Sequence, residues 1–244
     1  MRYAAESDSG KVRELNEDSY KIIAGHQGVP DTFIVADGMG GHSSGEVASR
    51  MAVEFAEEYV LKHPDMFSKE DTLSGIKKLM EEANRTVFLK AAESQENFGM
   101  GTTFIASVIL NNVLYIGHIG DSRVYLIREG RIQRLTTDHS YIEELVRNGS
   151  LTREEAENHP KKNIITRALG CEEEALVDTL SIGIEDGDIF VLCTDGLTNM
   201  LKEDEILAII SSNGEPKDAC RELVSLANEK GGDDNITVIV IKNS

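Results

Sequence analysis

Two apolar segments of this sequence end in the same way, on an aspartate that is followed by a glycine. Residues 33–38 read FIVADG, and residues 190–196 read FVLCTDG. Aspartate is depleted in β-strands and glycine weakens them. A buried strand that carries both at its tip therefore requires a turn or a contact at that point.

Three further aspartates stand beside apolar segments elsewhere in the chain. They are Asp18 in RELNEDS, Asp121 in HIGDSR and Asp234 in GGDDNITV. Aspartate and glycine are common turn residues, so for any single position a turn is the simplest interpretation. The repetition of the pattern at five positions favours a common functional role for these aspartates.

The spacing of apolar residues predicts both strands and helices. Strands are expected at residues 2–9, 19–24, 32–37 and 176–182, in a β-meander over 101–135 with turns at Asn111-Asn112, Gly120-Asp121 and Glu129-Gly130, and in DIFVLCTDG and ITVIVIK. Helices are expected at 44–62, 69–93, 203–212 and 216–229. Strands and helices do not alternate regularly, which disfavours a doubly wound parallel sheet. The order predicts an α+β fold, a four-layer α-β-β-α sandwich of two mostly antiparallel sheets flanked by helix pairs.

One segment does not fit the layers. Residues 139–169 are polar and helix-prone in short pieces such as SLTREEAENHP. Because this segment sits between sheet elements, we expect it to form a flap. The 244 residues contain no repeat and no obvious linker, so we expect a single domain over 1–244, with the flap at about 139–169 as its one subregion.

Composition restricts the partners and the compartment. The formal net charge is −18, which argues against nucleic-acid binding and against attraction to an anionic membrane. The cysteines Cys171, Cys193 and Cys220 are odd in number and lack a CxxC spacing, which predicts free thiols in a reducing compartment. No signal-peptide core and no run of ~18 apolar residues is present. We expect a cytoplasmic monomer without membrane insertion.

If the strand tips converge, the aspartates form a cluster that needs a counter-charge. Two like charges ~4 Å apart repel by about 4 kcal/mol at an effective dielectric constant of 20. Neither cysteine nor a pair of histidines accompanies these carboxylates, and an all-oxygen site suits hard ions such as Mg²⁺ or Mn²⁺. The glycine beside Asp37 would let an ion approach the main chain, so that the Gly38 carbonyl could also be a ligand.

The motifs, taken together in order, resemble the metal-dependent protein Ser/Thr phosphatases of type 2C, and specifically the small bacterial stand-alone members. The motifs that carry the resemblance are RELNED, VADGMGGHSSGEVAS, GMGTT, HIGDSRVYL, TDHS, ITRALG, LCTDGLTN and GGDDNIT. They span about residues 9 to 240, which is nearly the whole chain. The resemblance implies the same sandwich fold, with the flap beside the site.

The resemblance also implies a role for each site residue. Asp37 would bridge two ions, with the Gly38 carbonyl on the first, while Asp195 and Asp234 would bind the second. Asp18, and Glu17 as a further candidate, would hold that ion through water. Asp121 would share a third ion with Asp195, and Arg13 would bind the substrate phosphate. The substrates would be phosphorylated proteins, including a cognate Ser/Thr kinase.

The expected chemistry is hydrolysis without a protein nucleophile. A water between two divalent ions is deprotonated near neutral pH and would attack the phosphorus in line with the leaving Ser or Thr oxygen. Two candidates remain for the general acid, His42 and a metal-bound water. Many eukaryotic relatives carry a histidine at the position of Met39, and His42 stands three residues after it. His139 is expected to be a structural or flap residue, and His118 a core residue.

Three other interpretations are weaker. A two-metal nuclease or pyrophosphatase would share the carboxylates, but the acidic composition and the ordered motifs do not favour it. An inactive phosphopeptide-binding module should have lost Asp37, Asp195 or Asp234, and all three are present. A dinucleotide-binding domain built on GMGGHSSG lacks a GxGxxG in the right register and a following βαβ pattern.

Overall fold

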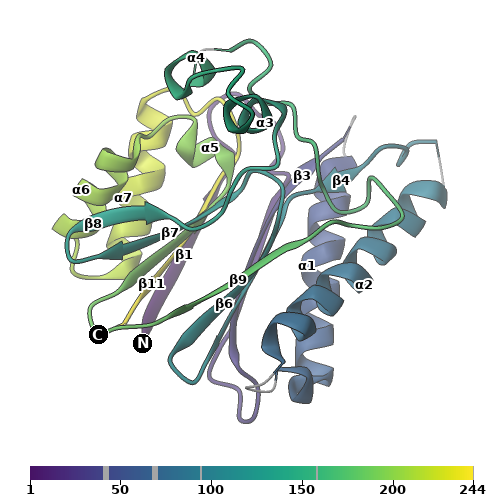
Figure 1. The fold of residues 1–244 in the computed structure, drawn as a ribbon, viewed down its shortest axis with the longest axis horizontal. Coiled ribbons are helices and arrows are strands. Elements are labelled where there is room, and N and C mark those ends of the chain that lie inside the picture. Colours follow the sequence, from purple (N-terminus) through teal and green to yellow (C-terminus); the bar gives the residue numbers. More distant parts are fainter. Residues whose placement is uncertain (41–43, 68–70, 94, 158, 244) are drawn as a thin grey trace.

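The computed structural model describes residues 1–40, 44–67, 71–93, 95–157 and 159–243. The strands of this part of the chain form two sheets whose pairings are antiparallel. The two sheets lie face to face, and helices cover the outer side of each sheet (Figure 1). The predicted α+β sandwich of four layers is therefore confirmed.

The first sheet contains both ends of the chain. Its strands, in spatial order, are β1 (Arg2–Asp8), β11 (Ile236–Lys242), β10 (Ile189–Cys193), β7 (Arg123–Arg128) and β8 (Arg131–Arg134). The last strand pairs with the first along its whole length, from Arg2 opposite Lys242 to Asp8 opposite Ile236. The two termini accordingly lie close together at one end of the molecule (Figure 1).

The second sheet is built mainly from the first half of the chain. Its strands, in spatial order, are β2 (Asp18–Ile23), β3 (Asp31–Met39), β5 (Phe104–Leu110), β6 (Val113–Ile119) and β9 (Asp178–Gly183), and the short β4 (Gly101–Thr102) extends the pairing of β3.

Each sheet is covered by a pair of helices. The helices are α1 (Ser44–Lys62) and α2 (Thr72–Glu93) on the second sheet, joined by η1 (Pro64–Met66), and α6 (Glu203–Ser212) and α7 (Pro216–Glu229) on the first. In α1 the buried residues Ala48, Ala52 and Ala56 recur every four positions, so small side chains form the stripe that packs on β3. No helix in the described part of the chain has the length and apolarity needed to cross a membrane.

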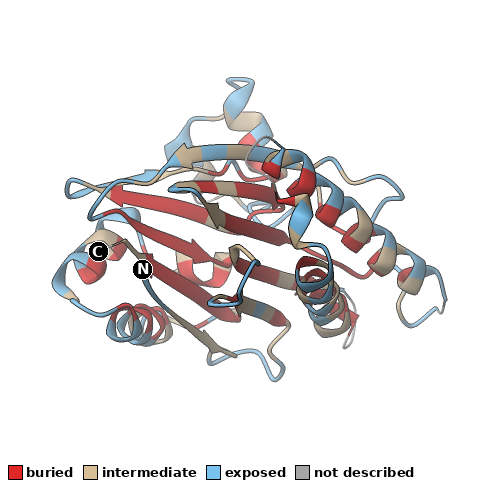
Figure 2. Cartoon of the chain, turned by 90° about the horizontal axis from the view of Figure 1, so that it is seen from below, coloured by how far each residue is buried: buried red, intermediate tan, exposed pale blue. Residues whose placement is uncertain are grey.

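The core consists of three layers of apolar side chains, one under each helix pair and one between the sheets. The strand β3 feeds two of them, because Ile34 and Ala36 face α1 whereas Phe33 and Val35 face the other sheet. Figure 2 shows the consequence, since the buried residues are concentrated on the strands and on the inner sides of the helices. The same alternation puts Asp37, two residues after Val35, on the face that points toward the other sheet.

Three short helices lie outside the layers. They are α3 (Tyr141–Arg147), α4 (Arg153–Glu157) and α5 (Asp195–Thr198). The first two belong to the polar 139–169 segment, which forms a small lobe at the end of the sandwich opposite the termini (Figure 1). The Ser140 hydroxyl caps α3 by accepting the Glu143 N–H at 3.2 Å.

Two expectations about the strands were wrong in detail. The β-meander over 101–135 is divided between the sheets, because β6 belongs to the second sheet and β7 to the first. Gly120-Asp121 is therefore the crossing between the sheets and not a hairpin turn. The strand around Asp37 also does not end there, since Gly38 and Met39 continue it by pairing with β4.

The packing of α2 on β6 depends on one glycine. A Cβ at Gly117 would lie 2.3 Å from Ile76 Cγ2 and 2.5 Å from Met80 Sδ, whereas a Cβ at Gly183 on β9 would meet nothing within 4 Å. We expect Gly117→Ala to lower the free energy of unfolding by about 1–3 kcal/mol through overpacking. Gly183→Ala is the control and should change it by less than about 1 kcal/mol. Denaturant unfolding measures both, and equal effects would contradict this account of the helix packing.

Candidate metal centre

Asp37 lies at the point where β3 leaves the apolar core. Phe33 and Val35 face the layer between the sheets, and the two-residue period of a strand puts Asp37 on the same face. Its partner across the ladder is Asp18, the first residue of β2. Directly opposed residues of antiparallel strands have Cβ atoms about 4.5–5.5 Å apart. The strand register alone thus brings two carboxylates together.

Asp18 connects the two sheets. It is 8% exposed, and its Oδ2 accepts a hydrogen bond from the Thr194 hydroxyl at 2.9 Å. Thr194 follows β10 in the other sheet, and its Oγ1 accepts the Thr237 N–H at 2.9 Å. The second carboxylate oxygen of Asp18, Oδ1, is buried without a hydrogen-bond partner among the described residues.

Asp195 and Asp234 come from two neighbouring strands of the first sheet. Asp195 opens α5 after β10, and Asp234 stands two residues before β11. A Cβ at Gly196 would lie 2.0 Å from the Asn235 carbonyl oxygen, so the glycine beside Asp195 allows the two segments to touch. Arg13 reaches the same edge, where its Nη2 donates to Asp234 Oδ2 at 2.8 Å.

Asp121 stands at the crossing between the sheets. It is 7% exposed, and its Oδ1 is buried without a partner in the described part of the chain. The hydroxyl of the next residue, Ser122, lies 2.7 Å from Thr103 Oγ1, which in turn accepts the Asp37 N–H at 3.0 Å. This chain of hydrogen bonds fixes the position of the crossing relative to Asp37.

Burial and mutual repulsion disfavour the charged form of these aspartates. Burial raises the pKa of Asp18 to about 7. Burial, followed by the charge of Asp18, raises the pKa of Asp37 well above its usual value. Burial and Asp195 do the same to the pKa of Asp121, and burial and Asp234 raise the pKa of Asp195. Asp37 and Asp195 nevertheless keep some surface open to solvent, so a ligand can reach the cluster.

The glycines near Asp37 have a packing role. A Cβ on Gly38 would lie 2.0 Å from the Gly45 carbonyl oxygen, and a Cβ on Gly45 would lie 2.6 Å from Glu17 Oε1. The close approach of β3 to the first turn of α1 therefore accounts for both glycines without any ligand. Ion binding by the Gly38 carbonyl stays a prediction.

The donor set fits a hard cation. The atoms Asp18 Oδ1, Asp121 Oδ1 and Glu17 Oε1 are buried carboxylate oxygens without partners in the described ranges, and such oxygens are the preferred ligands of Mg²⁺ and Mn²⁺. The same described residues contain no three Asp, Glu, His or Cys side chains that are already gathered as a metal-binding group. A bound cation would have to draw the repelling carboxylates inward.

His42 and Arg13 are the two predicted site residues with a basic side chain. His42 lies outside the described residues, so its role as general acid stays a prediction. The Arg13 side chain is 49% exposed. Burial opposes the charged guanidinium, but the contact with Asp234 outweighs it and raises the pKa of Arg13. The guanidinium is thus a fixed positive charge beside the carboxylates.

Sequence reasoning missed the neutral residues that assemble the site. Asn235 Oδ1 accepts the Glu17 N–H at 2.8 Å, and its Nδ2 donates to the carbonyl oxygens of Ser9 and Leu15 at 2.9 and 2.8 Å. It thereby holds the loop that carries Arg13. Thr194 and Thr103 link the aspartates as described above. The sequence position of these residues could have indicated their role, because Asn235, Thr194 and Thr103 each stand within one or two residues of a motif aspartate or glycine.

The chain matches a family model and curated relatives. The model described as Protein phosphatase 2C matches residues 10–234. The chain is 38% identical to a serine/threonine phosphatase stp of Listeria monocytogenes over 97% of its own length and 93% of the relative.

Solved structures show the same architecture. The crystal structure of the serine/threonine phosphatase PstP/Ppp of Mycobacterium tuberculosis superimposes with a TM-score of 0.88 at 35% identity, covering 98% of this chain and 97% of that one. A catalytic domain of the protein phosphatase PstP in complex with two manganese ions matches with a TM-score of 0.83 at 34% identity, covering 98% and 96% of the two chains.

The raised pKa of Asp18 predicts a pH-dependent effect on stability in chelator. The folded protein holds the Asp18 proton more tightly than the unfolded chain, so this carboxyl contributes stability below pH ~4 that is lost as the pH rises through about 7. In chelator at pH 8, Asp18→Asn should therefore be more stable than the wild type, by on the order of 2 kcal/mol.

At pH 4.5 that advantage should largely disappear, and denaturant unfolding at the two pH values measures the difference. Mn²⁺ at pH 8 should stabilise the wild type more than Asp18→Asn. An equal effect of the substitution at both pH values would contradict the assigned cause.

Proposed function

This chain belongs to the protein phosphatase 2C family and is a metal-dependent protein serine/threonine phosphatase, and we propose that its convergent aspartates hold the ions on which that activity depends. Asp37 is assigned to both core ions, with the Gly38 carbonyl on one of them and with Asp195 and Asp234 on the other. Asp18 is assigned a contact through water, with Glu17 beside it. A third ion is assigned to Asp121 and Asp195.

The observation that supports this assignment most strongly is the pair of unpartnered oxygens, Asp18 Oδ1 and Asp121 Oδ1. A buried carboxylate oxygen without a hydrogen-bond partner costs free energy and is uncommon in folded proteins. The two residues stand on opposite sides of Asp37, one opposite it in the ladder and one connected to it through Thr103. Divalent cations among these oxygens would offset the cost.

The reaction we propose needs only a few residues of the chain besides the ion ligands. Mn²⁺ or Mg²⁺ at the site would supply a deprotonated water near neutral pH and withdraw charge from the phosphoryl group. Arg13, held beside Asp234, would bind the phosphate of the phosphoserine or phosphothreonine, since a guanidinium has donors to spare beyond its single Asp234 contact. His42 is the candidate for protonating the leaving oxygen, with a metal-bound water as the alternative donor.

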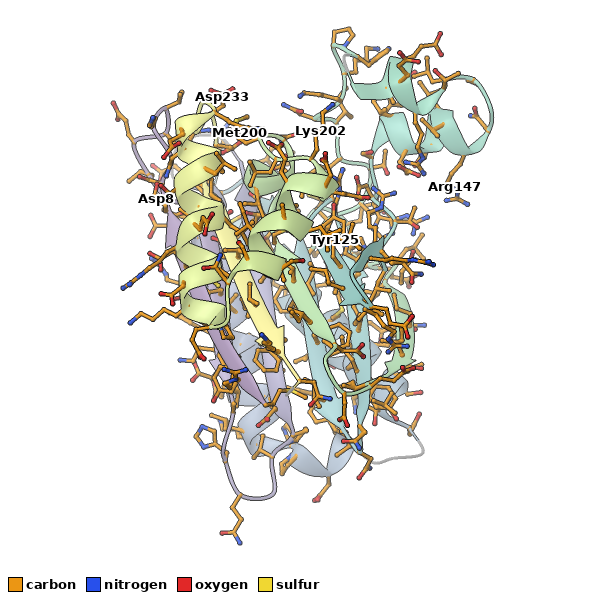
Figure 3. The ribbon with its side chains drawn as sticks, turned by 90° about the vertical axis from the view of Figure 1, so that its left-hand side faces the viewer. Asp8, Tyr125, Arg147, Met200, Lys202 and Asp233 are labelled. Carbon is orange, nitrogen blue, oxygen red and sulfur yellow. The ribbon has the colours of Figure 1, made fainter. Side chains whose placement is uncertain are left out.

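We further propose that the chain is a single catalytic domain over residues 1–244 and that its 139–169 segment is a flap which contacts the substrate polypeptide. A cleft of about 680 Å³ runs from Asp121 and Asp195 between this flap and α5–α6. Ile142 and Val146 line it on the flap side, and Lys202 lies on the opposite side. Figure 3 shows Met200 and Lys202 at the end of the molecule beside the flap. The lining combines apolar, basic and acidic side chains, and its basic groups would contact the acidic part of a phosphorylated peptide.

The physiological setting is part of the same proposal. The relatives named above are bacterial serine/threonine phosphatases, which supports phosphorylated proteins as substrates, with a cognate Ser/Thr kinase among them. We expect a cytoplasmic monomer, and sedimentation velocity would measure the oligomeric state.

The central test is hydrolysis of para-nitrophenyl phosphate and of a phosphothreonine peptide, with Mn²⁺ and with chelator. Wild-type activity should require Mn²⁺, and Asp37→Ala should lower kcat/KM at least about 100-fold on both substrates, because an ion ligand is lost. Asp31→Ala, at the other end of β3, is the matched control and should retain activity. Turnover that persists in chelator, or an active Asp37→Ala variant, would exclude this mechanism.

The cleft makes a separate prediction about substrate size. Lys202 is exposed on the cleft wall, and Lys217 is exposed on α7. Lys202→Glu should raise KM for the phosphothreonine peptide about three- to tenfold while leaving KM for para-nitrophenyl phosphate nearly unchanged, since only the peptide extends along the cleft. Lys217→Glu changes the net charge equally and should alter neither KM. A matching rise for both substrates would show that the cleft wall does not contact the peptide.

A further inference from the structure

His139 forms hydrogen bonds with both main-chain polar groups of Gly120. Its backbone N–H donates to the Gly120 carbonyl oxygen at 2.8 Å. Its ring Nδ1 accepts the Gly120 N–H at 3.1 Å. The His139 side chain is buried, with 6% of the residue exposed, so neither hydrogen bond competes freely with water. One residue therefore clamps the glycine that precedes Asp121.

Gly120 cannot restrain its own backbone conformation. Gly120 has φ = +106°, and a Cβ there would lie 2.6 Å from Thr103 Cβ and Cγ2, so only glycine fits. Glycine is also the residue with the greatest conformational freedom. The direction in which the chain leaves Gly120 sets where the Asp121 carboxylate points. The two hydrogen bonds with His139 restrain that direction, in addition to the contact between Ser122 and Thr103.

The ring of His139 is itself held in one orientation. Because Nδ1 accepts a hydrogen bond, the ring proton of the neutral imidazole is on Nε2. Nε2 lies 3.1 Å from Asp178 Oδ2 and donates to it. Arg167 Nη1 donates to the other oxygen of Asp178 at 3.3 Å. Asp178 on β9 thus selects the tautomer that can accept from Gly120.

A second imidazole packs against the first. The His118 ring lies with its centroid 4.9 Å from that of His139, and His118 is 1% exposed. Burial lowers the pKa of His118 to about 4, so this neighbour is neutral at physiological pH. It restrains the His139 ring without adding charge beside it.

His139 is also located where the two ends of the flap meet. Its carbonyl oxygen accepts the Thr166 N–H at 2.8 Å. Next to it, Ser140 bridges to Ile165, and the Tyr141 N–H donates to the Ile164 carbonyl at 2.8 Å. The base of the flap is therefore hydrogen-bonded to the same residue that contacts Gly120.

We propose that His139 is a positioning residue that holds Asp121 for ion binding through the main chain of Gly120, with Asp178 orienting the imidazole and the flap base hydrogen-bonded to the same residue. This inference rests on the proposed function of Asp121 as a ligand of the third ion. It assigns the histidine of the TDHS motif a task that packing alone does not require, because its Nδ1 acceptor is directed at one specific N–H.

Three substitutions separate this task from a general structural one. Asn places its Oδ1 near the position of the histidine Nδ1, Gln places its amide near the position of Nε2, and Ala has neither group. In chelator, hydrogen exchange of the Gly120 N–H should be about five- to tenfold faster in His139→Ala and His139→Gln, because one net hydrogen bond is lost. In His139→Asn it should stay within about threefold of wild type.

The same order should hold for the ion. The Mn²⁺ concentration for half-maximal hydrolysis of para-nitrophenyl phosphate should rise about tenfold in His139→Ala and His139→Gln, and much less in His139→Asn. Thermal unfolding checks that all variants are folded. If Gly120 stays equally protected in all of them, or if Asn fails to rescue either measurement, the positioning role is wrong.

Asp121→Asn distinguishes this failure from a failure of the proposed function. This variant keeps His139 and should leave the Gly120 N–H protected while raising the Mn²⁺ requirement. If Asp121→Asn leaves that requirement unchanged, Asp121 is not an ion ligand and the proposed third site is wrong. The exchange data would then still decide, by themselves, whether His139 clamps Gly120.

Discussion

The structure depends on keeping several carboxylates together at one end of a β-sandwich. Asp18 and Asp37 face each other in the ladder, and Asp121, Asp195 and Asp234 come close enough to raise the pKa values of their neighbours. At an effective dielectric constant of 20, any two carboxylates brought to ~4 Å from each other would repel by about 4 kcal/mol. A fold of marginal stability can carry only a limited amount of this repulsion; neutral groups restrain the carboxylates, and the cations that we propose would offset the repulsion.

The restraint comes from hydroxyl and amide groups that connect one sheet to the other. Thr194 donates to Asp18 across the gap, Thr103 accepts from the Asp37 main chain, and Asn235 fastens the loop that carries Arg13. These groups bring no charge into the cluster, so they position the carboxylates without neutralising them. The carboxylate oxygens thereby stay available for the cations that we propose.

The flap is joined to this end of the sandwich on two sides. On one side is the His139 anchor, and on the other a network of ion pairs in which the carboxylates are buried and the arginines remain partly or largely exposed. Arg123 on β7 makes a bidentate contact with Asp138 at 2.7–3.1 Å, and Glu143 of α3 pairs with Arg134 of β8 and with Arg153 of α4. Buried ion pairs add little net stability because desolvation offsets their attraction, but they fix geometry well. The position of the flap is in this way coupled to the strand that follows Asp121.

The sequence by itself determined the fold class, the order of the elements and the aspartates at the strand tips, because periodicity and Asp-Gly pairs are local signals. It also made the family recognisable. Only the tertiary structure decided that the meander splits between two sheets at Gly120, that Gly38 and Gly45 serve packing, and that His139 forms hydrogen bonds with both main-chain polar groups of Gly120. The reason is physical: the register of pairing and the contacts between residues far apart in the chain depend on which surfaces meet, and no short window of sequence contains both partners.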